Sequence, residues 1–135
     1  MKTRVSPSVM NPTVPLSPGI IANGFLYVSG FGPHDPVTGA MPTDIAAQTR
    51  AVFANLSLVL AEAGLDLSDV VKVTTHLQEL KRDFAGYNEV YAGFFSEPYP
   101  ARTTVGARLP TGLRSSRWFA DYAPMWSRWT CGCPC

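Results

Sequence analysis

Arg102 is the residue of this sequence best suited to hold a small carboxylate. It follows Pro100 and Ala101 at the start of a segment that alternates polar and apolar residues. A guanidinium offers a planar fork that binds a carboxylate through two parallel hydrogen bonds, and it stays charged at any working pH. An arginine on a strand is more often an exposed residue that pairs with an acid. The residue type alone therefore leaves both interpretations open.

Three further polar or small residues could contribute to a binding site. Ser29 and Gly30 follow an apolar run, where a small residue lets backbone amides approach a ligand and a hydroxyl can add a hydrogen bond. A turn that ends a strand explains the same pair equally well. Asn88 lies within a helical pattern that its side chain disfavours, so we expect it to make a specific hydrogen bond, structural or to a ligand. His34 and His76 have no partners at triad or ligand spacing and are interpreted as non-catalytic.

Composition narrows the class of protein. The chain has 135 residues, 46% hydrophobic and 16% charged, which suits one domain with one core. Its net charge of +1 provides no basic field for a phosphate backbone, so we expect no nucleic acid as main partner. The apolar runs are shorter than the ~20 residues of a membrane helix. No apolar segment of a secretory signal follows the basic N-terminus, and a cytoplasmic location is predicted.

All three cysteines lie within the last five residues, as Cys131, Cys133 and Cys135. A disulfide-stapled fold would distribute them along the chain. A zinc site would need a fourth ligand and usually a wider spacing. We therefore expect an incidental, mobile tail, with no metal and no cofactor.

The order of the elements follows from turn signals and periodicity. Four prolines predict an extended N-terminal arm over residues 1–18. Asn23-Gly24 predicts a hairpin between strands 19–22 and 25–28. Apolar residues at three, four and seven residue spacing predict a helix over residues 44–63.

The second half alternates strand and helix again. A strand is predicted over 70–77, with Val71, Val73, Thr75 and Leu77 on one face. A second helix begins near Asp83 and must end before Pro98. A last strand is predicted over 102–109.

The resulting order, β-β-α-β-α-β, indicates an α+β fold of two layers, a mixed sheet covered by two helices on one face. Because the other face of the sheet stays open, we expect a homo-oligomer.

Several short segments between Pro15 and Gly112 together resemble the RidA/YjgF family of enamine and imine deaminases, also called the endoribonuclease L-PSP family. They include Pro15-Leu-Ser-Pro-Gly19, Tyr27-Val-Ser-Gly30, Pro33-His-Asp-Pro-Val-Thr-Gly39, Asn88, Pro100-Ala-Arg102 and Leu109-Pro110. The resemblance implies a chorismate-mutase-like fold, a RidA-like domain over residues 19–113, and a homotrimer with clefts between subunits.

The resemblance also implies a reaction. Arg102 would hold the carboxylate of a small 2-imino or 2-enamino acid while water attacks the C=N carbon, releasing a 2-keto acid and ammonia. The substrate-binding positions that it implies are Leu16, Ser29, Gly30, Phe31, Asn88 and Thr104.

The chain departs from the family at several of these positions. Leu16, Phe31 and Thr104 stand where family deaminases commonly have Tyr, Gln and Cys, and Ser116 stands at the position of a Glu. The attacking water needs a group that orients it and takes its proton, a task suited to a carboxylate. The alternative is therefore a non-catalytic binder of small carboxylates or keto acids. A ribonuclease is disfavoured by the near-neutral charge and by the absence of a paired His or carboxylate constellation.

Residues 114–135 form an atypical tail for this family. Codons chosen for residues 114–119 can be read in another frame as Val-Val-Glu-Val-Val, which is typical of the family's last strand. A shifted reading frame is therefore one explanation of the tail. As written, residues 114–122 could still form a weak strand.

Overall fold

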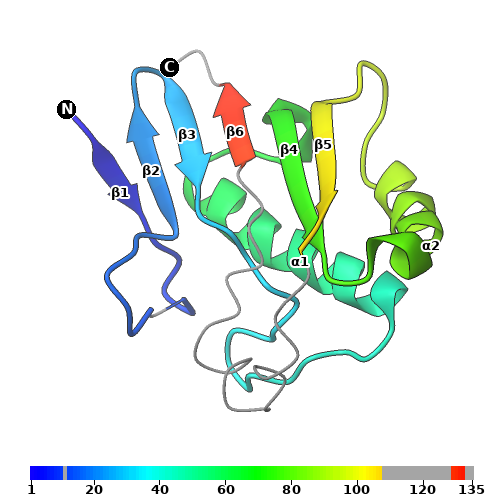
Figure 1. Cartoon of the computed structure of the whole chain (residues 1–135). Helices are drawn as coiled ribbons and strands as arrows, with labels where there is room; N and C mark the ends of the chain where they lie inside the picture. The colour runs from blue at the N-terminus through cyan, green and yellow to red at the C-terminus, as the bar shows by residue number, and fades with distance from the viewer. Residues whose placement is uncertain (11, 108–128, 133–135) are drawn as a thin grey trace.

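A mixed sheet of six strands forms one layer of the fold (Figure 1). The computed structural model describes residues 1–10, 12–107 and the backbone of 129–132. The strands are β1 (Thr3–Val5), β2 (Gly19–Ala22), β3 (Phe25–Val28), β4 (Val70–Leu77), β5 (Ala101–Gly106) and β6 (Trp129–Gly132). Their order in the sheet is β1-β2-β3-β6-β4-β5, and β4 and β5 are the parallel pair.

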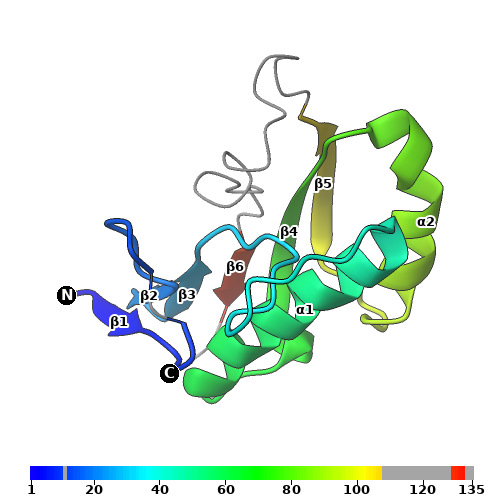
Figure 2. The ribbon, with the colours of Figure 1, turned by 90° about the horizontal axis from the view of Figure 1, so that it is seen from below.

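The second layer consists of helices α1 (Ile45–Glu62) and α2 (Leu80–Ala92), with a short 3-10 turn at Leu67–Asp69. Figure 2 shows both helices on the same side of the sheet. Within the described residues, no helix lies on its other face. The predicted two-layer α+β fold is confirmed. Among the described residues, no helix combines the length and hydropathy that a membrane span requires.

The core lies between the sheet and α1. Phe53, Leu56 and Val59 of α1 are almost completely buried, and Leu26 of β3 and Val73 of β4 meet them from the sheet. Burial of such side chains contributes about 1.5–3 kcal/mol each, which fixes the helix layer on this face.

Two local signals produce the expected structures. Asn23 and Gly24 both have positive φ, 52° and 74°, as a two-residue hairpin turn requires. The Oδ1 atom of Asp44 accepts a hydrogen bond from the N–H of Ala47 at 2.9 Å, which caps the N-terminus of α1.

Two details of the prediction are wrong. Helix α2 begins at Leu80, three residues before Asp83, and its cap residue Glu79 makes no side-chain hydrogen bond that could have signalled the start. Val71 does not share the buried face of Val73, because a register irregularity between Val70 and Lys72 turns Val70 inward and leaves Val71 exposed.

Two strands were missed. Thr3–Val5 of the N-terminal arm pairs with β2 and buries Val5. The backbone of residues 129–132 pairs with β3 and β4 in the middle of the sheet, so the mobile tail expected for the cysteine segment is wrong for Cys131 and Gly132. Residues 114–122, with their possible strand and shifted frame, lie outside the described residues, as do residues 108–109 of the predicted last strand.

Candidate functional site

The guanidinium of Arg102 lies between the edge strand β5 and helix α2. Its Nη1 donates a hydrogen bond to Oδ1 of Asn88 at 2.7 Å. Its Cζ lies 4.6 Å from the ring centroid of Tyr91 and 5.8 Å from that of Tyr87. Both distances are within the range of a cation–π interaction. Arg102 itself belongs to the exposed residues, so its charge is accessible.

Simple periodicity brings these groups together. Alternation along β5 places Arg102 and Thr104 on the face that the helices cover. On α2, Tyr87 and Tyr91 are four residues apart and Asn88 and Tyr91 three apart, so all three lie on neighbouring positions of one helix surface. The helix therefore presents one amide and two aromatic rings to the arginine of the edge strand.

The groups around Arg102 are neutral. The hydroxyls of Tyr87 and Thr75 are hydrogen-bonded at 2.8 Å. Burial raises the pKa of Tyr87, against the opposing effects of the Thr75 hydroxyl and the Arg102 charge. Burial also raises the pKa of Tyr91 to about 12, so neither tyrosine ionises near neutral pH. In the part of the chain that the structure describes, no carboxylate forms an ion pair with Arg102.

Arg102 forms a cluster with its neighbours Thr75, Tyr87, Asn88, Tyr91 and Thr104. Two buried hydroxyls of this cluster are unsatisfied. Within the described residues, Oη of Tyr91 and Oγ1 of Thr104 have no hydrogen-bond partner. Leaving a buried hydroxyl unpaired costs about 1–3 kcal/mol. Such groups often mark places where water or a ligand supplies the missing partner.

The residues at the end of β3 lie elsewhere. The Ser29 hydroxyl donates to the carbonyl of Ser17 at 2.7 Å, and the Ser29 N–H donates to the carbonyl of Pro18 at 2.9 Å. Leu16 is 43% exposed in the arm. Strands β6 and β4 lie between β3 and β5, so Ser29 and Gly30 are not brought to Arg102 within one chain.

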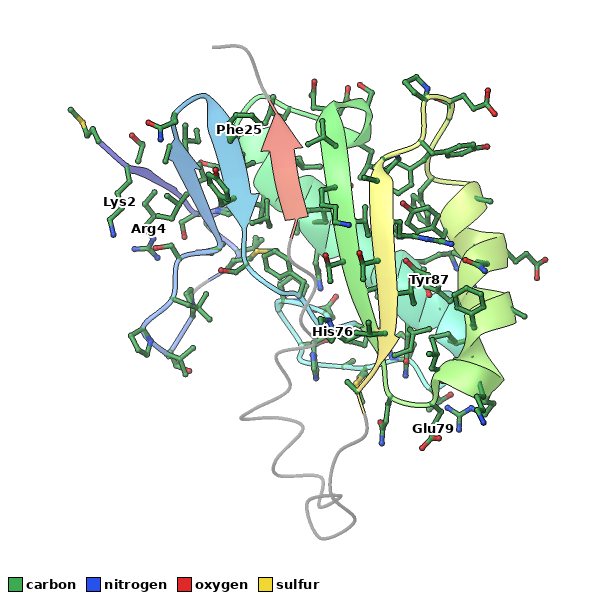
Figure 3. All side chains as sticks on the ribbon, turned by 45° about the horizontal axis from the view of Figure 1, so that its top comes forward. Lys2, Arg4, Phe25, His76, Glu79 and Tyr87 are labelled. Atoms are coloured by element: carbon green, nitrogen blue, oxygen red, sulfur yellow. The ribbon has the colours of Figure 1, made fainter. Side chains whose placement is uncertain are left out.

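Phe31 comes closer to the cluster than its neighbours do. It lines a cavity of about 30 Å³ together with Thr75 and Tyr87, among other residues of α1 and β4. That volume suits about one water molecule. Figure 3 shows Tyr87 on the α2 side of the sheet, where it borders both this cavity and Arg102.

Comparison with known proteins assigns the family. The sequence profile described as Endoribonuclease L-PSP matches residues 6–114. The chain belongs to the RidA/YjgF family. It is 46% identical over 101 residues to a RutC family protein of Pyrococcus horikoshii, a match that covers 73% of this chain and 79% of the relative. It is 36% identical over 116 residues to the 2-iminobutanoate/2-iminopropanoate deaminase of Escherichia coli, covering 83% and 88%.

Solved structures of the family have the same fold. Yeast Mmf1 superimposes with a TM-score of 0.80 at 28% identity, covering 99% of this chain and all of that one. The YjgF gene product of Escherichia coli gives a TM-score of 0.76 at 28% identity, covering 96% and 98%. The fold implied by the family resemblance is thereby confirmed.

Sequence reasoning missed three members of the cluster in this RidA/YjgF chain: Thr75, Tyr87 and Tyr91. The two tyrosines of α2 were assigned no role at the site from the sequence. Their spacing around Asn88 was the available signal, because residues at i, i+3 and i+4 share a helix surface. Thr75 could have been found from the parallel pairing of β4 and β5, where it lies opposite Thr104.

No group of three or more His, Cys, Asp or Glu residues in the described chain is arranged to hold a metal ion.

Proposed function

We propose that this chain hydrolyses small 2-imino and 2-enamino acids to 2-keto acids and ammonia, with Arg102 as the anchor for the substrate carboxylate. The observation that carries the proposal is an exposed guanidinium held by neutral groups, with no acidic partner among the described residues. Family membership and the name of the Escherichia coli relative support the same chemistry.

The reaction needs one water and no further reagent. A carboxylate in the fork of Arg102 fixes the neighbouring C=N carbon. Water adds to this carbon and passes a proton to nitrogen, and the C–N bond of the resulting carbinolamine then breaks as ammonia leaves. The product is the 2-keto acid. In this proposal the catalysis comes from positioning: Arg102 orients the substrate, and the attacking water is held in an ordered place beside the C=N carbon.

A complete site requires more than one copy in this proposal. Because two strands separate Ser29 and Gly30 from Arg102, a cleft between subunits would draw these two groups from different chains. The open sheet face offers the contact surface. Phe25 and Tyr27, which are 43% and 46% exposed, lie on it opposite the buried Leu26 and Val28 of the same strand. Burial of this surface in a homotrimer would remove the exposed apolar area from water.

A non-catalytic carboxylate binder is the second candidate. In the described part of the chain no acid lies in ion-pair contact with Arg102, and Ser116, at the family's Glu position, is outside that part. A binder would keep the arginine and its neutral surroundings and lack the group that takes a proton from water.

A coupled assay of keto-acid release from freshly generated 2-aminoacrylate or 2-iminobutyrate tests the proposal. We expect the wild type to accelerate release and Arg102→Ala to lose the acceleration. Arg82→Ala is the matched control, since Arg82 is also exposed but pairs with Asp83. Equal rates for the wild type and Arg102→Ala would overturn the deaminase. Arg102-dependent binding without turnover would establish the binder, and RNA cleavage sensitive to Arg102→Ala would revive the ribonuclease.

A further inference from the structure

We propose that Asn88 and Tyr91 are positioning residues for Arg102, and that their neutrality keeps the full charge of the guanidinium for the bound carboxylate. This inference rests on the proposed function and assigns Asn88 a different role from direct substrate contact. It concerns how the arginine is held, and so predicts which substitutions beside it weaken binding.

Asn88 fixes the position of one end of the guanidinium. The 2.7 Å hydrogen bond from Nη1 joins the middle of α2 to the edge of the sheet. An amide oxygen accepts this bond with a partial charge only, whereas an aspartate in the same place would form an ion pair. With aspartate at position 88, the guanidinium would already be paired with a carboxylate. That pair would occupy the planar hydrogen-bonding geometry that the carboxylate of a ligand needs.

Tyr91 supports the guanidinium from the side of its ring. Its ring centroid lies 4.6 Å from Cζ, and its own ring is held by neighbours at 5.9 Å (Phe53), 5.6 Å (Tyr87) and 4.8 Å (Phe95) between centroids. A buried ring packed on three sides cannot follow a mobile side chain. The ring therefore restricts the arginine side chain before a ligand binds. Because less side-chain freedom is then left to lose, the entropic cost of ligand binding is smaller.

Tyr91 could have been a second source of negative charge, and its surroundings prevent this. Only 5% of the residue is exposed, and desolvation favours its neutral phenol. Phenylalanine would therefore supply the same support for the arginine. The useful part of Tyr91 in this proposal is its ring.

Two readouts on the full chain test the proposal. Calorimetric titration with 2-ketobutyrate measures binding, and NMR of ¹⁵N-labelled arginine side chains measures rotation of the guanidinium, with the Arg102 signal assigned by its loss in Arg102→Lys. The variants are Asn88→Ala, Asn88→Asp, Tyr91→Phe and Tyr91→Leu. Ala54→Asp, on an exposed position of α1, adds the same charge away from Arg102.

We expect Asn88→Asp to bind 2-ketobutyrate at least about 10-fold more weakly than the wild type, and more weakly than Asn88→Ala, with no change in Ala54→Asp. Tyr91→Phe should bind as the wild type does, and Tyr91→Leu about 3- to 10-fold more weakly with faster guanidinium rotation. Asn88→Asp that binds like the wild type, or rotation unchanged in both Asn88→Ala and Tyr91→Leu, would overturn the inference. The Asn88 variants decide the matter if Tyr91→Leu does not fold.

Failure of the proposed function gives a different pattern. If the wild type and Arg102→Ala bind 2-ketobutyrate equally, Arg102 is not the carboxylate anchor. The NMR readout still measures whether Asn88 and Tyr91 restrict the arginine, because it needs no ligand. Unrestricted rotation in the wild type would then contradict the positioning role as well.

Discussion

Arg102 and Asn88 are joined by a 2.7 Å hydrogen bond between the edge strand β5 and the middle of helix α2. The bond links the two layers of the fold at the point where the sheet ends. It also places a permanent cation on neutral supports, with no ion-pair partner in the described part of the chain. In the proposed function an anionic ligand supplies the missing charge, which is the basis of the predictions on binding.

Replacing Thr75 by valine should destabilise the protein by about 1–3 kcal/mol, because the buried Tyr87 hydroxyl loses its 2.8 Å partner. The unfolding free energy from urea titration measures this. In Thr75→Val combined with Tyr87→Phe both polar groups are gone, and the loss should be smaller than the sum of the single losses. Additive losses would show that the two hydroxyls do not depend on each other.

Asn55 should be essential for the segment between β3 and α1. Its Nδ2 donates to the carbonyls of Gly32 at 3.1 Å and His34 at 2.7 Å. Asn55→Ala should cost about 1–3 kcal/mol of unfolding free energy, and Asn55→Asp at least as much, since a carboxylate cannot donate to carbonyls. Arg50→Ala, exposed on the same helix, should change stability by less than about 0.5 kcal/mol. Equal effects at positions 50 and 55 would contradict this tethering role.

How far the sequence determines these features can be judged from individual residues. The two-layer fold followed from local signals, such as the Asn23-Gly24 turn and the cap at Asp44, which act within a few residues. Arg102 was found from its chemistry and from the family motif. The partner of Asn88 was not, because a hydrogen bond between residues 14 apart depends on how a helix packs on a strand.

The missed elements have a similar explanation. Thr3–Val5 contains one buried apolar residue, which is too short a pattern to predict a strand. Strand β6 joins β3 to β4 from a four-residue segment in which only Trp129 and Cys131 alternate with Thr130 and Gly132, a pattern too short to predict a strand without the long-range pairing. Val71 was assigned to the wrong face because a bulge shifts the alternation without a local signal.

Stability should decline in alkaline solution through Tyr91. Its pKa in the folded protein is about 12, above the ordinary value of 10.0, because burial penalises the phenolate. The folded chain therefore holds this proton more tightly than the unfolded chain, so the stabilisation is complete below pH 10 and is lost as pH rises towards 12. Urea midpoints measured across this range should fall with pH in the wild type.

Tyr91→Phe is the control for the alkaline effect. It keeps the ring beside Tyr87 and Arg102 and removes the titrating hydroxyl, so its midpoints should fall less steeply. A residual slope is expected from Tyr87, whose pKa burial also raises. Identical slopes in the wild type and Tyr91→Phe would contradict the assignment.

Charge on the open sheet face should break the proposed assembly. Tyr27 is 46% exposed on that face, beside Phe25, with a centroid distance of 6.4 Å. Tyr27→Lys would bury an unpaired charge between subunits, and light scattering under reducing conditions should give a monomer mass. Val37→Lys, at a residue 78% exposed, should keep the mass of the wild type. A wild type that is monomeric at all concentrations would remove the cleft between subunits.

Calorimetric titration of the wild type and Arg102→Ala with 2-ketobutyrate and with its uncharged methyl ester tests carboxylate recognition most directly. A charged, bidentate contact predicts that the wild type binds the acid and not the ester, and that Arg102→Ala loses about 10- to 100-fold in affinity for the acid. Arg82→Ala, which removes an exposed arginine elsewhere, should bind as the wild type does. Equal binding of acid and ester by the wild type, or undiminished binding of the acid by Arg102→Ala, would contradict the role of Arg102.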